Sequence, residues 1–352
     1  MRVIRPNSIL LPDHITASNV QAVCYPAWSG AVSYMVGDRI VSSSVVYECL
    51  VANINCTPAS YLTGSTPKWK SLGASYTTYN AATAYTVGQR CVSGVVIYEC
   101  LVNTTGNAPE TNLTGVTPKW LYIGYDNRYA MFDAVVGSQT YGHSTVNSGS
   151  ITFTITPGMV DSVAFLDLEA TSLTISMVAG STTVYSNTVN LIDNSSIEDA
   201  YKYFFNPIIL SKVCVLNLPP YDATISVTIN NTDAIAKCGT AVFGMQFDLG
   251  LTQYNPTMSI TDYSRKDVDT FGNYTIVQRA FSKRMSCELT LANTNIDAVH
   301  QVLSAYRATP VVWVGSDQAY AAMVIYGFYK SFSIAIPYPD NSTCSLEIEG
   351  LT

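Results

Sequence analysis

A tandem duplication is the feature that most limits how this chain of 352 residues can fold. Residues 34–73 align without a gap onto residues 85–124 at a constant offset of 51, and 21 of the 40 positions are identical. Such self-similarity indicates two copies of one structural unit. Each copy holds a Tyr-x-x-Gly turn, two runs rich in β-branched residues and a closing Thr-Pro-Lys-Trp segment, a pattern that predicts a small all-β module.

The aromatic residues of the two copies allow two interpretations. A module of about 45 residues buries little area, so the aromatics shared by both copies are expected mainly to fill its core. The alternative is an exposed aromatic face that stacks on a sugar ring. Trp28, Tyr61 and Tyr79 are the better candidates for that face, because they differ between the copies or lie outside the expected strands. The full set of candidate carbohydrate-binding residues is Trp28, Tyr61, Tyr79, Trp69 and Trp120.

Composition excludes several functional classes. The net charge is -7 with only 18 Lys and Arg, which argues against nucleic-acid binding, since that needs a basic surface. No apolar run approaches the roughly 20 residues of a membrane helix, so membrane insertion is not expected. The N-terminus does not resemble a signal peptide, and we expect folding in a cytoplasm. The nine cysteines contain no CxxC pair and are expected to be mostly buried thiols.

The remainder of the chain also predicts β-structure. Short apolar or alternating runs are separated by Gly, Pro, Asn and Asp, which favours an antiparallel sandwich of the jelly-roll kind, followed by a smaller β-rich or α+β domain. Strands are expected at 151–156, 161–168, 172–178, 213–218, 223–229, 274–279, 284–291, 311–315, 322–329 and 332–337. One helix is expected after an Asn295 cap and before Pro310. The predicted units are an N-terminal arm (1–25), the two modules (26–73 and 74–124), the β-sandwich (125–250) and the C-terminal domain (251–352).

Catalytic and metal-binding patterns are scarce. The three histidines, His14, His143 and His300, do not supply a constellation, and no nucleophile elbow, phosphate loop or dinucleotide fingerprint occurs. One carboxylate cluster, Asp262, Asp267 and Asp269, is compatible with glycoside hydrolysis or a structural cation. Arg265 and Lys266 are interleaved with it, so a solvated turn with local ion pairs is the simpler interpretation. We therefore expect no enzyme activity, no cofactor and no bound metal.

The duplicated unit resembles the small chitin- and cellulose-binding modules of the family-5/12 type. The resemblance lies in Trp28, Tyr34-x-x-Gly37-Asp38, Tyr47-Glu48-Cys49, Pro58 and Trp69. It covers about 100 residues. The second copy departs from the pattern, with Tyr79 in place of the opening Trp and Gln89 in place of Asp38. The resemblance implies an aromatic sugar-binding face.

The rest of the chain is similar to structural proteins of the tail tip or baseplate of tailed bacteriophages. The similarity lies in Asn127–Asp133, in Asp262–Lys266 with Phe271-Gly272, and in Pro310–Gly315 with Tyr326-Gly327. It implies a non-enzymatic virion protein, made in the host cytoplasm, that assembles with other tail subunits and with copies of itself. Host cell-surface polysaccharide is a further implied partner. Two alternatives remain open at this point, namely a glycan-binding adhesin and a glycoside hydrolase with appended modules.

Overall fold

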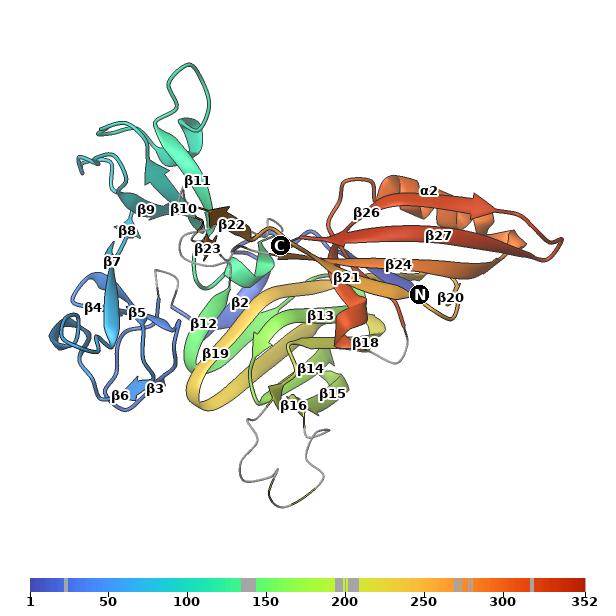
Figure 1. Ribbon diagram of the computed structural model, residues 1–352, viewed down its shortest axis with the longest axis horizontal. Coiled ribbons are helices and arrows are strands. Elements are labelled where there is room, and N and C mark those ends of the chain that lie inside the picture. Colours follow the sequence, from blue (N-terminus) through green and yellow to red (C-terminus); the bar gives the residue numbers. More distant parts are fainter. Residues whose placement is uncertain are drawn as a thin grey trace.

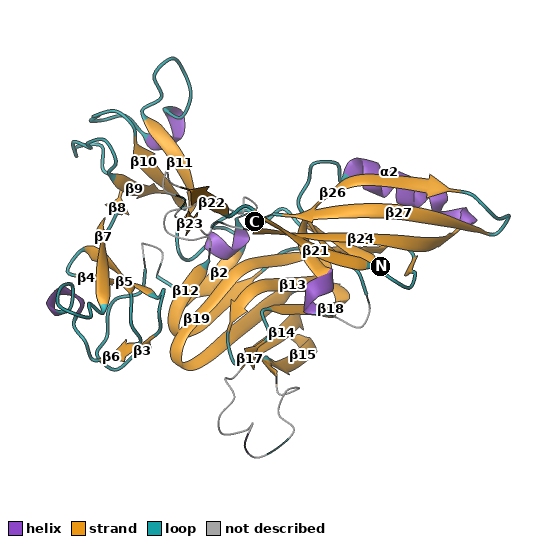
Figure 2. Cartoon of the chain, in the orientation of Figure 1, coloured by secondary structure: helices purple, strands orange, loops and turns teal. Residues whose placement is uncertain are grey.

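The computed structural model shows a mainly β protein, as the sequence predicts (Figures 1 and 2). It describes residues 1–351 except 22–24, 134–143, 194–198, 200, 202–208, 269–271, 273, 278, 280 and 317–319. The described part holds large antiparallel sheets and one α-helix of ten residues, α2 (Ile296–Ala305). No helix in these ranges is long and apolar enough to cross a membrane.

The two modules have the same architecture. In each, a two-stranded hairpin pairs with a closing strand that begins at the tryptophan of Thr-Pro-Lys-Trp. Both hairpins pair an Arg opposite a Glu, Arg39 with Glu48 and Arg90 with Glu99. The strands of the first module are β3 (Ser33–Tyr34), β4 (Arg39–Ser42), β5 (Val45–Cys49), β6 (Asn53–Ile54) and β7 (Trp69–Ala74). Those of the second are β8 (Thr77–Thr78), β9 (Arg90–Ser93), β10 (Val96–Cys100) and β11 (Trp120–Tyr125).

The body of the molecule contains two layers of β-strands, and long bent strands contribute to both layers. The strand β19 (Thr224–Asp248) is 25 residues long. Its first part lies between β12 (Thr145–Ile155) and β14 (Ser172–Ala179), and its later part pairs with β13 (Met159–Glu169). The largest apolar core lies between these layers. The body strands not yet named are β2 (Ile15–Ser18), β15 (Thr182–Asn190), β16 (Ile192–Asp193), β17 (Ile209–Leu210) and β18 (Val213–Asp222).

The N-terminal segment is part of the large sheet and not a separate arm. Strand β1 (Arg2–Pro6) pairs with the end of β19 on one side and with β25 (Val311–Val314) on the other. Val3 and Ile4 are fully buried, in two different apolar clusters. Gly244 allows this approach, because a Cβ there would lie 1.8 Å from the carbonyl oxygen of Arg5. Strand β1 therefore joins the sandwich to the C-terminal sheet.

The C-terminal unit is an antiparallel sheet covered by the expected helix. Val299 and Leu303 of α2 are buried in the core that this sheet forms. The helix follows a 3-10 turn, Asn293–Asn295. Asn295 occupies the N-cap position as predicted, although its side chain makes no cap hydrogen bond. The sheet contains β20 (Leu251–Thr252), β21 (Thr257–Asp262), β24 (Phe281–Ala292), β26 (Val324–Ala335) and β27 (Asn341–Gly350), next to β25. A separate hairpin is formed by β22 (Arg265–Val268) and β23 (Tyr274–Val277).

The cysteines behave as the sequence predicts. All eight described cysteines are free and buried, and Cys24 lies outside the described residues. Burial raises the pKa of the Cys214, Cys287 and Cys344 thiols to about 11. These thiols therefore act as small apolar side chains in the cores.

Candidate functional site

Trp69 and Trp120 are core residues and do not form a sugar-binding face. Their exposed fractions are 0% and 1%. Each indole donates a hydrogen bond to a backbone carbonyl, Trp69 to Cys56 at 2.9 Å and Trp120 to Asn107 at 3.0 Å. Each also meets a tyrosine edge-on at 5.2 Å. The core-filling interpretation is confirmed, and stacking on a sugar would require a face that these rings do not offer.

Trp28 and Tyr79, which occupy equivalent positions, are only partly exposed. Tyr79 stacks on Tyr85 at 5.6 Å and meets Trp120 edge-on at 6.1 Å. The indole nitrogen of Trp28 and the hydroxyl of Tyr79 are buried, and neither has a hydrogen-bond partner within the described part of the chain. Both rings therefore point their polar atoms into the module.

Tyr61 is the most exposed of the five candidates, with an exposed fraction of 41%. The Nζ atom of Lys68 lies 5.1 Å from its ring centroid, a cation–π contact. The second module has Asn112 at the equivalent position and so lacks this ring. The structure therefore does not gather the five candidates on one face.

Each module exposes an apolar trio that the sequence analysis did not single out. In the first module it consists of Val36, Leu50 and Val51, and in the second of Val87, Leu101 and Val102. The Gly37 amide bonds the Cys49 carbonyl and Gly88 bonds Cys100 in the same way, which sets the two contributing segments side by side. The sequence held a signal for these trios, because the same three apolar residues occur at equivalent positions of both copies.

The two described carboxylates of the 262–269 cluster, Asp262 and Asp267, are held in local contacts. Asp267 forms an ion pair with Arg265 at 2.8 Å, and Asp262 accepts the Ser264 amide at 2.8 Å. Hydrogen bonds from Ser264 lower the pKa of Asp262. Asp269 lies outside the described residues. Asp262 and Asp267 thus take part in the local turn and ion-pair structure that the sequence favours.

The two described histidines lie in different parts of the fold. His14 lies in the N-terminal turn, where its Nδ1 accepts the Leu10 amide, and His300 on α2 packs against Phe332. His143 lies outside the described residues. Within the described ranges, no group of three or more His, Cys, Asp or Glu is placed to hold a metal ion.

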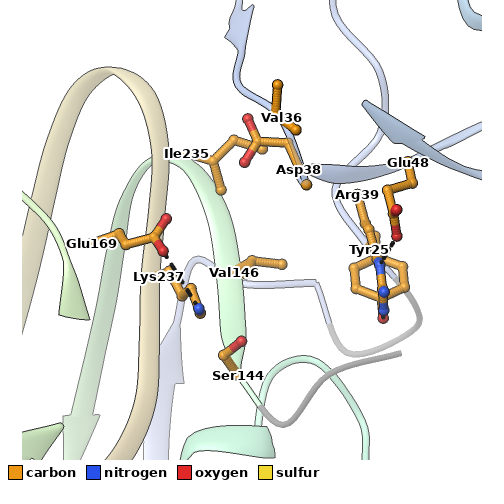
Figure 3. Close-up of a pocket in the computed structure, with 11 residues that line it drawn as sticks. Tyr25, Val36, Asp38, Arg39, Glu48, Ser144, Val146, Glu169, Ile235 and Lys237 are labelled. Carbon is orange, nitrogen blue, oxygen red and sulfur yellow. Dashed lines mark hydrogen bonds and ion pairs between the residues drawn. The ribbon is translucent and has the colours of Figure 1, made fainter. Parts of the chain in front are cut away.

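A pocket of about 430 Å³ lies where the first module meets the body (Figure 3). The module contributes the turn that carries Asp38 and the hairpin that carries Arg39 and Glu48, while the body contributes Glu169 and Lys237. The pocket residues are Tyr25, Val36, Gly37, Asp38, Arg39, Glu48, Ser144, Val146, Glu169, Ile235 and Lys237.

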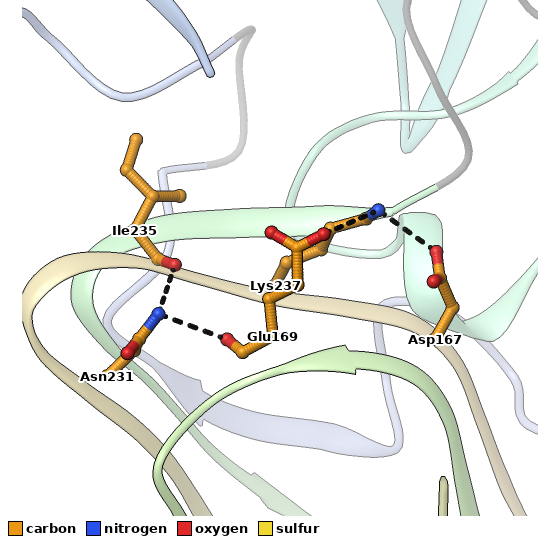
Figure 4. A network of polar contacts seen from close by, with 5 residues as sticks. All are labelled: Asp167, Glu169, Asn231, Ile235 and Lys237. Atoms are coloured by element: carbon orange, nitrogen blue, oxygen red, sulfur yellow. Dashed lines mark hydrogen bonds and ion pairs between the residues drawn. The ribbon is translucent and has the colours of Figure 1, made fainter. Parts of the chain in front are cut away.

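Most charged groups of the pocket are held by partners. Arg39 pairs with Glu48 at 2.9 Å, and Lys237 lies 3.0 Å from Asp167 and 3.5 Å from Glu169 (Figure 4). Asn231 supports this wall, because its amide donates hydrogen bonds to the carbonyls of Ile235 at 2.8 Å and Glu169 at 3.4 Å.

Asp38 is the exception in this pocket. Its Oδ2 accepts the Met35 amide, but no Lys or Arg of the described ranges forms an ion pair with it. Burial raises the pKa of Asp38 to about 6, and the charge of Glu169 adds to this effect. The Met35 hydrogen bond and the more distant Lys237 act in the opposite direction. Sequence reasoning missed this site, because its residues come from segments far apart in the chain.

An exposed apolar surface lies at the end of the C-terminal sheet where β21 ends and β24 begins. Met285, Cys287, Leu289 and Leu291 alternate along β24 and are buried, whereas Phe281 continues the same side of this strand and is exposed. On the neighbouring strand β21, Met258 lies opposite Met285 and Ile260 opposite Lys283. The nearby β22–β23 hairpin adds exposed Tyr274 and Ile276. We call Met258, Ile260, Tyr274, Ile276 and Phe281 the arm surface.

Comparison with known proteins adds no relative. Neither the scan against protein-family models nor the search of curated proteins found a match to this chain.

Proposed function

We propose that this chain is a non-enzymatic structural protein of a phage tail tip or baseplate, which assembles with other tail subunits and with copies of itself in the virion. The observation that carries the proposal is the arm surface. Beyond the core residues of the C-terminal sheet, the same side of β24 continues through Lys283 to the exposed Phe281, beside exposed Met258 and Ile260 of β21. An apolar patch of this kind is typical of a protein–protein contact.

Backbone pairing supports the same role. Among the described strands, β21 pairs only with β24, and β22 and β23 pair only with each other. The outer backbone edges of β21 and of this hairpin are therefore available to a strand of a neighbouring subunit.

Charge supports contact with a second copy of the chain. Residues 257–284 hold five Lys or Arg and three Asp, whereas the whole chain has a net charge of -7. Residues 257–284, which carry the arm surface, are thus basic and the remainder of the chain is acidic, so this segment of one copy is attracted to the acidic remainder of another. The apolar trios of the two modules offer further contact surface.

The pocket favours a binding or structural role over hydrolysis. Glu48 and Glu169 are engaged in ion pairs, and Asp38 accepts the hydrogen bond that closes its turn. A retaining or inverting glycosidase instead needs two carboxyl groups that are free to act on the scissile bond.

Sedimentation velocity of the purified chain tests the assembly proposal. We expect concentration-dependent self-association that weakens at high salt, because opposite charges contribute to the contact. The double variant Ile260→Ser/Ile276→Ser is expected to weaken association at least tenfold, since it removes two exposed apolar side chains. The matched control Ile54→Ser/Val116→Ser changes two exposed apolar side chains of the modules that lie outside the trios, and it should associate like the original chain. A monomer at all concentrations, or equal weakening by both variants, would contradict the arm contact.

A virion location is tested separately, by mass spectrometry of purified particles from cells that produce the chain. Under this proposal, the chain remains with the particles after gradient purification, at a constant ratio to the other tail proteins. Its absence from intact particles would overturn the virion role.

Contact with host cell-surface polysaccharide through the modules is a second candidate function, favoured by the exposure of Tyr61 beside Lys68. An aromatic ring with a nearby cation and open access can stack on a sugar. Glycan-array binding should therefore be lost in Tyr61→Ala and retained in Asn112→Ala, which changes the equivalent position of the second module. Equal binding by both variants would exclude this face.

A further inference from the structure

The pocket at the junction of the first module and the body contains a charge that the module fold does not need. In the first module, the Asp38 carboxylate accepts the Met35 amide and closes the turn. In the second module, the neutral Gln89 side chain accepts the Thr86 amide at 2.8 Å and closes the same turn. The turn therefore requires an acceptor and not a charge.

The body surrounds this charge only in the first module. Val36, Gly37 and Asp38 line the pocket together with Glu169 and Lys237 of the body. Their counterparts Val87, Gly88 and Gln89 line no part of it. The acidic residue, Asp38, therefore occurs in the module whose turn faces the body, and the neutral Gln89 occurs in the other module.

The pocket has an excess of negative charge. Asp38, Glu48 and Glu169 line it, and Asp167 adjoins it through Lys237. Among the described lining residues, Arg39 and Lys237 are the cations that oppose these four carboxylates. Asp38 and Glu169 belong to different units and face the same pocket, where the charge of Glu169 contributes to the raised pKa of Asp38. A cation between the two walls would relieve this repulsion.

The lining indicates which kind of cation fits. Carboxylates bind an ammonium group through short charge-assisted hydrogen bonds. Ser144, Tyr25 and the Arg39–Glu48 pair offer further donors and acceptors, while Val146 and Ile235 supply an apolar wall. A volume of about 430 Å³ is within the range of small-ligand sites. A ligand with a hydroxylated carbon skeleton would form hydrogen bonds with the polar lining residues and pack its carbon atoms against the apolar ones.

We propose that this pocket binds a small hydroxylated ammonium compound of the size of an amino-sugar ring, with its ammonium group between Asp38 and Glu169. No residue of the arm surface lines the pocket, so binding here is independent of the assembly role proposed above.

Isothermal titration calorimetry of the full chain, in phosphate buffer at pH 7, tests the proposal. The probes are glucosamine, N-acetylglucosamine and glucose, which share a ring and differ in the charge at one position. We expect saturable binding of glucosamine and at least tenfold weaker binding of the two neutral sugars. Absence of glucosamine binding, or equal affinity for all three sugars, would overturn the proposal.

Three variants locate the binding. Asp38→Asn keeps an amide acceptor for the turn, as Gln89 does naturally, and should lower glucosamine affinity at least tenfold. Glu169→Gln should lower it in the same direction. The matched control Gln89→Glu places a carboxylate at the equivalent turn of the second module, and its affinity should equal that of the original chain. Unchanged binding in Asp38→Asn, or a second equivalent of ligand bound by Gln89→Glu, would contradict the assignment.

Discussion

At the scale of single residues, the two modules provide an internal comparison of identical side chains in two settings. Trp69 and Trp120 have the same burial, the same backbone acceptor position and the same edge-on tyrosine. Their role is therefore set by the module itself. Asp38 differs from its counterpart Gln89. Asp38 lines the junction pocket together with residues of the body, whereas Gln89 does not line this pocket. The properties of Asp38 are set by tertiary contact.

Truncation of a module tryptophan should be costly in both copies. We expect Trp69→Ala and Trp120→Ala each to lower the free energy of unfolding of the affected module by about 3–5 kcal/mol, because each leaves a large cavity. Tyr61→Ala should change it by less than about 0.5 kcal/mol, since this ring is exposed. Urea unfolding followed by circular dichroism measures these values. A Trp69→Ala chain as stable as Tyr61→Ala would show that the indole is not a core residue.

Stability should depend on pH through Asp38. Its pKa rises from 3.8 to about 6 on folding, so the folded chain binds this proton more tightly than the unfolded chain. The associated stability is complete below about pH 4 and is lost as the pH rises through about 6. Asp38→Asn removes this loss. The Tm of the variant should therefore exceed that of the original chain at pH 8 and match it near pH 4, as measured by differential scanning calorimetry.

The calorimetric comparison uses the difference between two chains, because other groups also titrate. Burial raises the pKa of Asp126 to about 7, and this contribution is present in both chains. A Tm difference that is the same at both pH values would assign the effect to something other than the Asp38 charge.

At the scale of elements, long strands hold the body together by belonging to more than one layer. Strand β19 pairs with β12, β13, β14 and β1 at different points along its length. Opposite the single residue Gly149 of β12, β19 has four residues (231–234) between the partners Asn230 and Ile235, which forms an enlarged bulge in β19. The bulge increases the local bend, which allows one strand to serve both layers.

Gly244 on β19 should tolerate no side chain. In Gly244→Ala the added Cβ would overlap the Arg5 carbonyl and push β1 away from β19, at a cost of about 3 kcal/mol in the free energy of unfolding. Gly158→Ala is the matched control, because that position has a φ of +76° and open space, so only local strain of about 1 kcal/mol is expected. Chemical denaturation compares the two variants. Equal costs would show that β1 does not pack closely at Gly244.

At the scale of the whole molecule, strand β1 couples units that are far apart in sequence. Its Val3 side chain enters the core of the C-terminal unit, and Ile4 enters the cluster between this unit and the sandwich. The first strand of the chain therefore lies between β19 and β25, next to residues at least 238 positions away.

Removal of this strand should uncouple the two units. We expect the sandwich and the C-terminal sheet of the original chain to unfold in one calorimetric transition, and a chain that lacks residues 1–6 to show two. Ile4→Ala provides a milder test, with an expected loss of about 2–5 kcal/mol. Exposed Arg5→Ala serves as its control. A truncated chain that unfolds like the original would contradict the coupling role of β1.

Much of the fold could be predicted, because it depends on local patterns. Alternating apolar residues located β14, and the spacing of Val299 and Leu303 located α2. Strand β15 was missed because its polar residues lie at an exposed edge and give no apolar signal. The second half of β19 was missed because Asn-Asn-Thr-Asp interrupts it, although Asn231 satisfies the backbone there by bonding the Ile235 carbonyl.

The sequence by itself determined the duplication, the β-rich composition and the burial of the module tryptophans, since these depend on residue type and on spacing within about 40 positions. Only the tertiary structure decided where β1 pairs and which groups meet at the junction pocket. Strand pairing joins segments through backbone groups that every residue carries, so the sequence contains little record of the choice of partner. The charge at Asp38 acquired its environment from Glu169, more than 100 residues away, and only folding brings those two side chains together.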